Sequence, residues 1–297
     1  MQLHLFGATT ATGTAFCDLA LKYYPSCEIF VYSRSSGPHL VDFDDSLSFQ
    51  PAGNIAAPSV WISFAPIWKF APFFEQFVLN HPERLGNLLG VLVCSSSSSI
   101  TKRFAFNPFD RELVAQLKYS EDLIIRCCRT LETPCHVLQP TLIYGCVGSY
   151  SDRNLTILLT LLRRLPFLFL PSASGYRQPI HSTQLAEVSL HLIDQFFQHT
   201  SSSAFPELIQ LGGDTTLTYL AMILSIQAAQ PNNDPAHRCR IILIPNRLFF
   251  LLTSCVLLVS PKLYEAILRM GSNLSGFTTV HELLRTDPKV FPVQPFG

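Results

Sequence analysis

The sequence predicts an α/β protein built on a doubly wound parallel sheet, with a smaller α/β substrate lobe toward its C-terminal end. Its first apolar run, residues 3–6, stops at Gly7 and passes through small residues to Gly13, where helix-forming residues begin. Residues 88–94 form a continuous apolar run, which is typical of a parallel strand buried on both faces. Five or six strand segments alternate with helical segments, and this order favours a doubly wound sheet.

The composition indicates a globular chain with few charges. Its 297 residues are 48% hydrophobic, which is ample for a large core. The 21 basic and 21 acidic residues cancel, so no net field favours nucleic acid. Charged residues make up only 14% and phenylalanine occurs 23 times, so we expect an apolar surface, or one covered by a partner or a membrane.

The nine cysteines lack the spacing of a disulfide framework or of a zinc site. We therefore expect reduced thiols and no metal. The chain opens directly in a strand, without a basic leader segment, and we expect a cytoplasmic protein.

The first fourteen residues are typical of the strand, tight turn and helix start of a dinucleotide-binding (Rossmann) unit. Small residues are needed there because a pyrophosphate must approach the backbone and bind free N–H groups at the helix N-terminus. Thr10 stands where a GxxGxxG pattern has its middle glycine, and an ordinary turn is the alternative interpretation. The loop residues expected to contact the cofactor are Gly7, Ala8, Thr9, Thr10, Thr12 and Gly13.

The end of the second predicted strand, residues 28–32, indicates which cofactor binds. It runs into Ser33 and Arg34, and an arginine there suits a 2′-phosphate, whereas an acidic residue would suit a free ribose. We therefore expect NADP in preference to NAD, with a solvated loop arginine as the alternative. Strands are also predicted at residues 39–43 and 59–64. The remaining expected cofactor contacts are Asp42, Ser63, Ala65, Pro140 and Tyr144.

A serine tract, residues 95–99, directly follows the buried strand 88–94. Open α/β sheets bind ligands at the carboxyl edge of their strands, so we interpret this tract as a hydroxyl-lined active-site loop rather than a linker. Ser96 and Ser97 are candidates for orienting a substrate hydroxyl, and Lys102 is the first cation beyond the tract.

The other expected elements follow the same patterns of periodicity and flanking residues. Helices are expected at residues 15–24, 68–79, 109–131, 152–164 and 280–284, and strands at 134–145, 207–211 and 240–244. The aromatic residues of the second helix are interpreted as packing. Residues 248–261 carry no formal charge and are too few to span a bilayer, which takes about twenty residues. We expect a buried helix there, with a helix lying on a membrane surface as the alternative.

The motifs together resemble the extended short-chain dehydrogenase/reductase family, which includes nucleotide-sugar epimerases and dehydratases. They are the glycine loop, the serine tract, residues 140–145 (PTLIYG), and residues 177–181 (RQPIH) followed by 184–186 (QLA). More narrowly, the chain is similar to a bacterial branch of NAD-dependent epimerase/dehydratases. The resemblance implies an NAD(P)-binding core at residues 1–165, and a part at 166–297 that completes the core and forms the substrate lobe.

The family's catalytic group departs from its usual form in this chain. The family places a Ser or Thr at the fifth strand end, and a Tyr and a Lys four residues apart on the next helix. If Lys118 is that lysine, Val114 occupies the tyrosine position, and Tyr119 has Leu123 four residues after it, so the sequence contains no YxxxK. The acid or base then comes from elsewhere, such as Lys102, Tyr144 or Tyr119, or no hydride chemistry occurs. The candidate catalytic residues are Ser96, Ser97, Lys102 and Lys118.

The resemblance also implies the substrate side of the site. Asn154, Arg177 and His181 are expected to bind substrate, with Arg177 suited to a nucleotide diphosphate and His181 open to a structural role. The partner expected is a small molecule such as a nucleotide sugar, and a homodimer is open. Two other functions stay open. One is a cofactor-binding structural or assembly protein on a membrane contacted through residues 248–261, and the other is a reductase of lipid-linked substrates.

Overall fold

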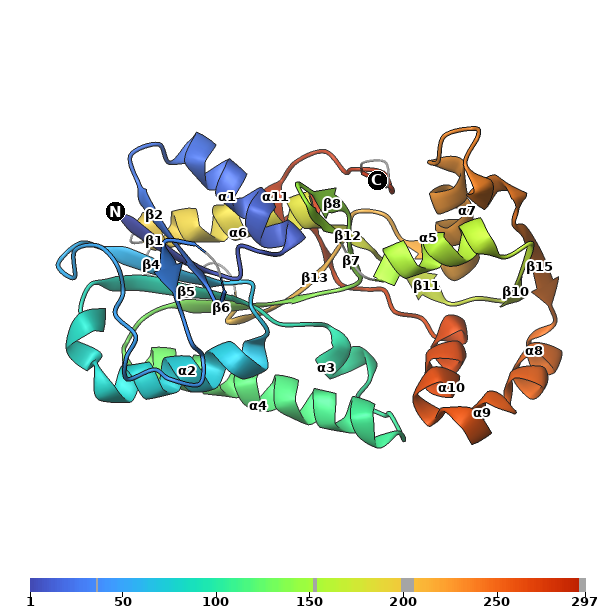
Figure 1. Cartoon of the computed structure of the whole chain (residues 1–297), viewed down its shortest axis with the longest axis horizontal. Helices are drawn as coiled ribbons and strands as arrows, with labels where there is room; N and C mark the ends of the chain where they lie inside the picture. The colour runs from blue at the N-terminus through green and yellow to red at the C-terminus, as the bar shows by residue number, and fades with distance from the viewer. Residues whose placement is uncertain (36, 152–153, 199–205, 294–297) are drawn as a thin grey trace.

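A computed structural model describes residues 1–35, 37–151, 154–198 and 206–293. Its centre is an eight-stranded sheet in the order β16-β13-β6-β5-β4-β1-β2-β3, in which every pair of neighbours is parallel. Helices cover both faces (Figure 1), which confirms the predicted doubly wound α/β fold. The strands are β1 (Gln2–Phe6), β2 (Glu28–Ser33), β3 (His39–Leu40), β4 (Ser59–Ser63), β5 (Leu88–Cys94), β6 (Cys135–Pro140), β13 (Leu208–Gly212) and β16 (Thr278–Thr279).

The two faces of the sheet carry different side chains because neighbours along a strand point to opposite sides. In β1, Leu3 and Leu5 pack toward one layer of helices, whereas Phe6 packs toward the other. The first layer holds α1 (Ala11–Tyr23), α6 (Ser182–Phe197) and α11 (Val280–Leu284), and the second holds α2 (Ile67–Asn80) and α4 (Pro108–Thr130). The sheet is therefore buried on both faces.

Phenylalanines form the core between the sheet and α2. Phe70, Phe73, Phe74 and Phe77 are fully buried on α2 and contact Phe6 or Trp61 at ring distances of about 5 to 6 Å. Their spacing of three and four residues places them on one face of the helix. This confirms the packing role expected for the aromatic helix.

The order of strands reverses between β1 and β4, because the chain first builds outward through β2 and β3 and then returns to the other side of β1. The connections leaving these two strands diverge, and such a switch point opens a crevice at the carboxyl edge of a parallel sheet. The carboxyl ends of β5 and β6 lie beside it.

A second, smaller α/β lobe lies beside the sheet domain (right side of Figure 1). A parallel pair of strands and two helices enclose its core. Its elements are α5 (Asn154–Arg164), β10 (Phe167–Pro171), α7 (Tyr219–Ala228), β15 (Arg240–Ile244), α8 (Asn246–Thr253), α9 (Val256–Val259) and α10 (Pro261–Leu268). Two short pairs lie where the lobes meet: β7 (Ile143–Tyr144) with β12 (Ile180–His181), and β11 (Tyr176–Arg177) with β14 (Leu217–Thr218). A hairpin of β8 (Cys146–Val147) and β9 (Tyr150–Ser151) packs against α1. Because α5 packs in its core, the lobe begins before residue 165.

Two expectations about individual elements are wrong. The strand expected at residues 39–43 ends at Leu40, because Asp42 then accepts the N–H of Asp44 and closes a turn. The buried helix expected at residues 248–261 is instead two short exposed helices, α8 and α9. Leu258 is 90% exposed, since α5, α7 and β10 already fill the core of the lobe. No helix in the described ranges is long and apolar enough to cross a membrane.

We predict that Phe73→Ala lowers the free energy of unfolding by about 3 to 5 kcal/mol, because it leaves a cavity within the phenylalanine core. Urea denaturation followed by circular dichroism measures the change. The matched variant Phe106→Ala removes a ring that is 90% exposed, and its effect should stay within about 0.5 kcal/mol. Equal losses in the two variants would contradict this assignment of the core.

Candidate functional site

The loop after β1 has no room for side chains at its two glycines. Gly7 has a φ of +81°, and a Cβ there would lie 2.4 Å from the backbone nitrogen of Ala65. A Cβ on Gly13 would lie 2.4 Å from the carbonyl oxygen of Gly7. The backbones of β1, α1 and the β4 end therefore pack as closely as the sequence pattern predicts.

Thr10 stands where the pattern usually has a glycine, and its side chain links the start of the turn to the first turn of α1. It is the N-cap of α1: its Oγ1 donates to the carbonyl of Gly7 (2.9 Å) and accepts the N–H of Gly13 (3.0 Å). The next two residues, Ala11 and Thr12, have N–H groups with no partner inside the helix. The loop keeps the anion-binding character of a helix N-terminus, with Thr9 exposed and Thr12 buried.

The neighbouring strand ends supply the rest of the predicted cofactor side. Ser63 is fully buried, and its hydroxyl has no hydrogen-bond partner among the described residues. Arg34 is exposed directly after Ser33, which ends β2. Asp42 is exposed, and one of its carboxylate oxygens is used in its own turn. A dinucleotide fits this edge of the sheet. Gly7 and Gly13 keep the loop after β1 free of side chains, so that a pyrophosphate can reach the backbone, and the cation of Arg34 follows β2.

A cavity of about 440 Å³, here called the central cavity, lies between the serine tract and the second lobe. It brings together five residues expected from the sequence: Ser96, Ser97, Lys102, Pro140 and Arg177. It also contains groups that sequence reasoning missed, chiefly Thr141, Gln178, Tyr219 and Arg269. Leucine, isoleucine and methionine side chains complete its wall.

A buried carboxylate holds the serine tract in place. Glu121 of α4 accepts hydrogen bonds from the Ser95 hydroxyl and from Nε2 of Gln139 (2.9 Å), and Gln139 also donates to Ser99 (3.0 Å). Burial raises the pKa of Glu121, although these hydrogen bonds act in the opposite direction. The ends of the tract are thereby tied to β6 and α4, and its middle residues line the central cavity.

Asp110 joins the two lobes beneath the cavity. Its carboxylate accepts Lys102 Nζ at 2.9 Å and Arg269 Nη1 at 3.0 Å, and the side chain is only 1% exposed. Burial acts to raise the pKa of Asp110, but hydrogen bonds from Asn107 and Lys102 lower it to about 2. Asp110 therefore holds both cations of the cavity floor, and Arg269 is also paired with Glu265 at 3.8 Å.

Arg177 is committed to the backbone. Its Nη1 donates to the carbonyls of Tyr176 and Ser272 (2.7 Å each), and its Nη2 donates to the carbonyl of Arg269. Its guanidinium lies 5.1 Å from the ring centroid of Tyr219. Arg177 thus shapes the wall of the cavity and places a cation against a phenol, with much of its donor fork already used.

Other predicted residues lie outside the central cavity. Lys118 and Tyr119 are exposed on α4. Tyr144 is buried, and its hydroxyl accepts the N–H of Val293. Asn154 begins α5, and nothing more is described of it.

His181 caps helix α6. Its Nδ1 lies 2.7 Å from the Thr183 hydroxyl and accepts the Thr183 N–H, while the Gln184 side chain accepts the backbone N–H of His181. Burial, with a smaller effect of Lys289, lowers the pKa of His181 to about 4, so the ring is neutral at pH 7. These contacts are structural.

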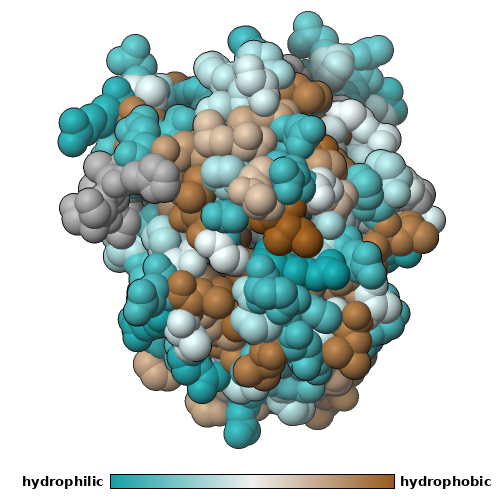
Figure 2. All heavy atoms as spheres, turned by 90° about the vertical axis from the view of Figure 1, so that its left-hand side faces the viewer, coloured by the Kyte–Doolittle hydropathy of each residue, from teal (hydrophilic) through white to brown (hydrophobic). Residues whose placement is uncertain are grey.

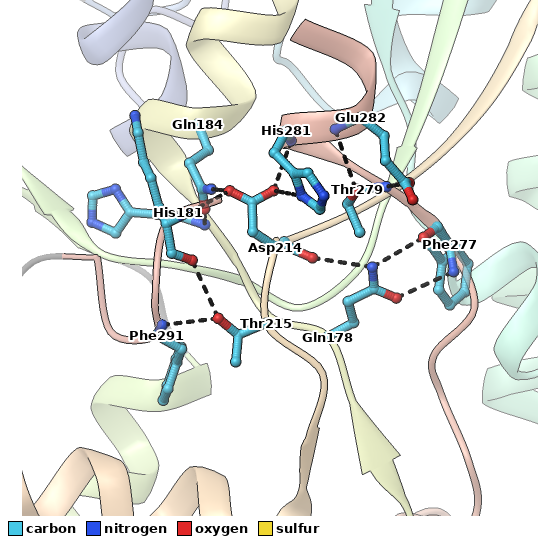
Figure 3. A network of polar contacts seen from close by, with 12 residues as sticks. Gln178, His181, Gln184, Asp214, Thr215, Phe277, Thr279, His281, Glu282 and Phe291 are labelled. Carbon is cyan, nitrogen blue, oxygen red and sulfur yellow. Dashed lines mark hydrogen bonds and ion pairs between the residues drawn. The ribbon is translucent and has the colours of Figure 1, made fainter. Parts of the chain in front are cut away.

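A polar network beside this cap joins the sheet edge to the chain's last segment (Figure 3). Asp214 accepts hydrogen bonds from Gln184 of α6 and from the backbone N–H groups of His281 and Lys289. Gln178 donates to the carbonyls of Gly213 and Phe277 and accepts two backbone N–H groups. The back wall of the central cavity is fixed by this network.

No family model matches the sequence, and no curated protein matches it. Solved structures do match. The UDP-glucuronic acid 4-epimerase of Bacillus cereus, in complex with NAD, has a TM-score of 0.62 at 12% identity, covering 99% of this chain and 93% of its own. The human epimerase family protein SDR39U1 (isoform 2) with NADPH has a TM-score of 0.62 at 14% identity, covering 99% and 96%. A GDP-mannoheptose C4 reductase from Campylobacter jejuni with NADP bound has a TM-score of 0.56 at 13% identity, covering 82% and 88%.

The chain shares the fold of these solved structures. The first two similarities run over nearly the whole chain, sheet and second lobe alike. The fold expected from the sequence motifs is thereby confirmed, while identities of 12 to 14% carry no residue roles with them.

We predict that Asp110→Asn lowers the free energy of unfolding by about 3 kcal/mol at pH 7, because it leaves two half-buried cations without their anion. Urea denaturation measures this loss. The folded-state pKa of Asp110, about 2, lies below its ordinary value of 3.8, so its stabilisation is present above pH 4 and is lost as the pH falls toward 2.

The same experiment between pH 5 and 2 should show a flatter stability profile in Asp110→Asn than in the wild type. Asp287→Asn, which changes an exposed aspartate, is the control and should leave the profile unchanged. A variant profile as steep as that of the wild type would contradict the role given to Asp110.

Proposed function

We propose that the chain binds NADP, in preference to NAD, and acts as a cytoplasmic oxidoreductase, epimerase or dehydratase on a nucleotide-linked sugar or a similar activated alcohol or carbonyl. The glycine loop carries the proposal, because Gly7 and Gly13 exclude side chains where a pyrophosphate must reach the backbone. Structures of similar fold support it, since they include a UDP-glucuronic acid epimerase with NAD and a GDP-mannoheptose reductase with NADP.

The residues around the switch point would hold the cofactor. The N–H groups at the start of α1 would bind the pyrophosphate, Arg34 would pair with the 2′-phosphate, and Ala65 and Pro140 would border the nicotinamide half. When bound, the cofactor supplies or accepts the hydride. Ser96 and Ser97 then orient the reacting oxygen of the substrate in the central cavity.

Tyr219 is the proton donor in this proposal. Val114 leaves the family's tyrosine position apolar, whereas Tyr219 lines the central cavity with the Arg177 cation against its ring. Burial raises the pKa of Tyr219 and Arg177 acts to lower it, so the phenol keeps its proton at pH 7 and a neighbouring cation stabilises the phenolate once the proton leaves. The proton passes from the Tyr219 hydroxyl to the substrate oxygen as the carbonyl is reduced. Lys102 also lines the cavity, with its charge paired to Asp110.

A structural or assembly protein that holds NADP without turnover is the second candidate. Val114 favours it, together with the exposed position of Lys118 outside the central cavity. Such a protein would contact a membrane through residues 248–261 or pair with a second copy. It predicts tight NADPH binding with no consumption of NADPH by any substrate tested.

We predict that the wild type binds NADPH more tightly than NADH, measured by quenching of protein fluorescence. Arg34→Ala should weaken NADPH binding about tenfold, or about 1.4 kcal/mol, and leave NADH binding unchanged, because it removes only the 2′-phosphate partner. Arg238→Ala, an exposed arginine of the second lobe, is the control. Absence of binding to either cofactor in the folded wild type would refute the proposed function.

We predict that Tyr219→Phe slows NADPH consumption by about 10² to 10⁴, the range of a lost general acid, while NADPH binding is unchanged. The assay follows NADPH absorbance with a panel of UDP- and GDP-linked 4-keto sugars. Tyr176→Phe is the matched control, since Tyr176 is 47% exposed and lies outside the lining of the central cavity. Full activity in Tyr219→Phe would remove Tyr219 from the mechanism, and no turnover by the wild type would favour the second candidate.

A further inference from the structure

An exposed apolar surface lies where the segment before α4 meets the C-terminal helices. Phe104, Phe106 and Phe109 are 78%, 90% and 65% exposed, and Leu258 and Val259 of α9 are 90% and 86% exposed. These five residues are called the apolar platform below. Large side chains at this exposure are costly in water unless something covers them.

Contacts between the two segments make the platform one surface. The backbone N–H of Phe106 donates to Glu265 of α10 at 3.0 Å, and the Lys262 ammonium lies 5.6 Å from the ring centroid of Phe109. Helices α9 and α10 meet at Ser260, which caps α10. Figure 1 shows the start of α4 beside these helices.

The exposed charges on the two segments that carry the platform are positive, and the acid beside them, Glu265, is mostly buried and accepts the backbone N–H groups of Phe106 and Asn107. In residues 103–110 and 246–264, every exposed charged side chain is positive: Arg103, Arg247 and Lys262. The single acid in these ranges is the buried carboxylate that joins the lobes. Arg103 lies 4.8 Å from the ring centroid of the phenylalanine beside it. The chain as a whole has no net charge, so this cationic border is local.

We propose that the apolar platform docks the protein on an anionic lipid bilayer. Exposed aromatic and aliphatic side chains bordered by Lys and Arg are suited to the boundary between head groups and acyl chains, where the cations reach anionic head groups. A second copy is a poorer occupant, because a two-fold interface would set the same cations against each other. Figure 2 looks onto the other end of the molecule, the sheet end at the left of Figure 1, where hydrophobic residues are interspersed with hydrophilic ones.

Docking in this way places the substrate site at the bilayer surface. A second cavity of about 430 Å³ is lined by Phe104 and Phe106 of the platform, and it shares Lys102 and Arg269 with the central cavity. The open side of the site would therefore face lipid. The proposal does not rest on the proposed enzymatic function, because vesicle binding is measured without cofactor or substrate.

Vesicle flotation with the full chain tests the proposal. The wild type should float with vesicles of equal phosphatidylglycerol and phosphatidylcholine, bind phosphatidylcholine alone much more weakly, and lose binding as salt is raised. The double variant Phe104→Ser, Phe106→Ser and the single variant Lys262→Glu should each lower the bound fraction roughly tenfold. Leu40→Ser and Leu79→Ser remove residues that are 65% and 72% exposed elsewhere, and both should bind as the wild type does.

A thermal melt of each variant establishes that it is folded. NADPH binding is measured separately, so that a loss of vesicle binding is distinguished from a loss of cofactor binding. The proposal is overturned if the folded wild type stays with neither vesicle, or if the Leu79 control loses binding as fully as the phenylalanine variant. It is also overturned if light scattering shows a dimer that only the platform variants dissociate, since a second copy would then cover the surface.

Discussion

The carboxylate of Asp110 is the contact on which the geometry of the candidate site depends. It binds Lys102, just beyond the serine tract, and Arg269, at the end of α10, so one anion fixes the sheet domain against the second lobe. The carbonyl of Arg269 in turn accepts a hydrogen bond from Arg177, which places its cation against Tyr219. A chain of charge-assisted contacts thus runs around the floor of the central cavity. Without the anion, two cations would face each other there and the lobes would lose their common support.

The two halves of the site are built in different ways. The proposed cofactor half is formed by residues that are close together in the sequence. Thr10 makes hydrogen bonds to residues three positions before and after it, and the two glycines allow the tight packing of the same turn. The substrate half is assembled over long separations, with Asp110 meeting Arg269 across 159 positions. A local turn forms wherever its own residues allow, whereas the substrate half exists only after both lobes have packed. We therefore expect substitutions in the second lobe to disturb the cavity while leaving the glycine loop intact.

The tyrosine of α4, Tyr119, is exposed and lies outside the lining of the central cavity, which gives the second lobe a larger part in the proposed chemistry. In the family pattern the acid comes from the helix after the serine-bearing strand, but in this chain that position is Val114. The phenol that lines the central cavity instead comes from α7, and its neighbouring cation comes from β11 rather than from a lysine one turn away. The proposed acid is therefore carried by the second lobe, at the start of α7.

The sequence by itself determined the sheet, the glycine loop and the serine tract. Those features follow from local sterics and from periodicity: Gly7 is required by its own φ, and residues 88–94 are apolar throughout because both faces of β5 are buried. Four of the residues that it singled out, Ser96, Ser97, Lys102 and Arg177, line one cavity. Three features become visible only in the folded protein: Glu121 holds the serine tract, Tyr219 lines the central cavity, and residues 248–261 are largely exposed. Each of these depends on which distant segment occupies the neighbouring space. A run of leucines has the same local pattern whether it fills a core or stays exposed because other helices already fill that core.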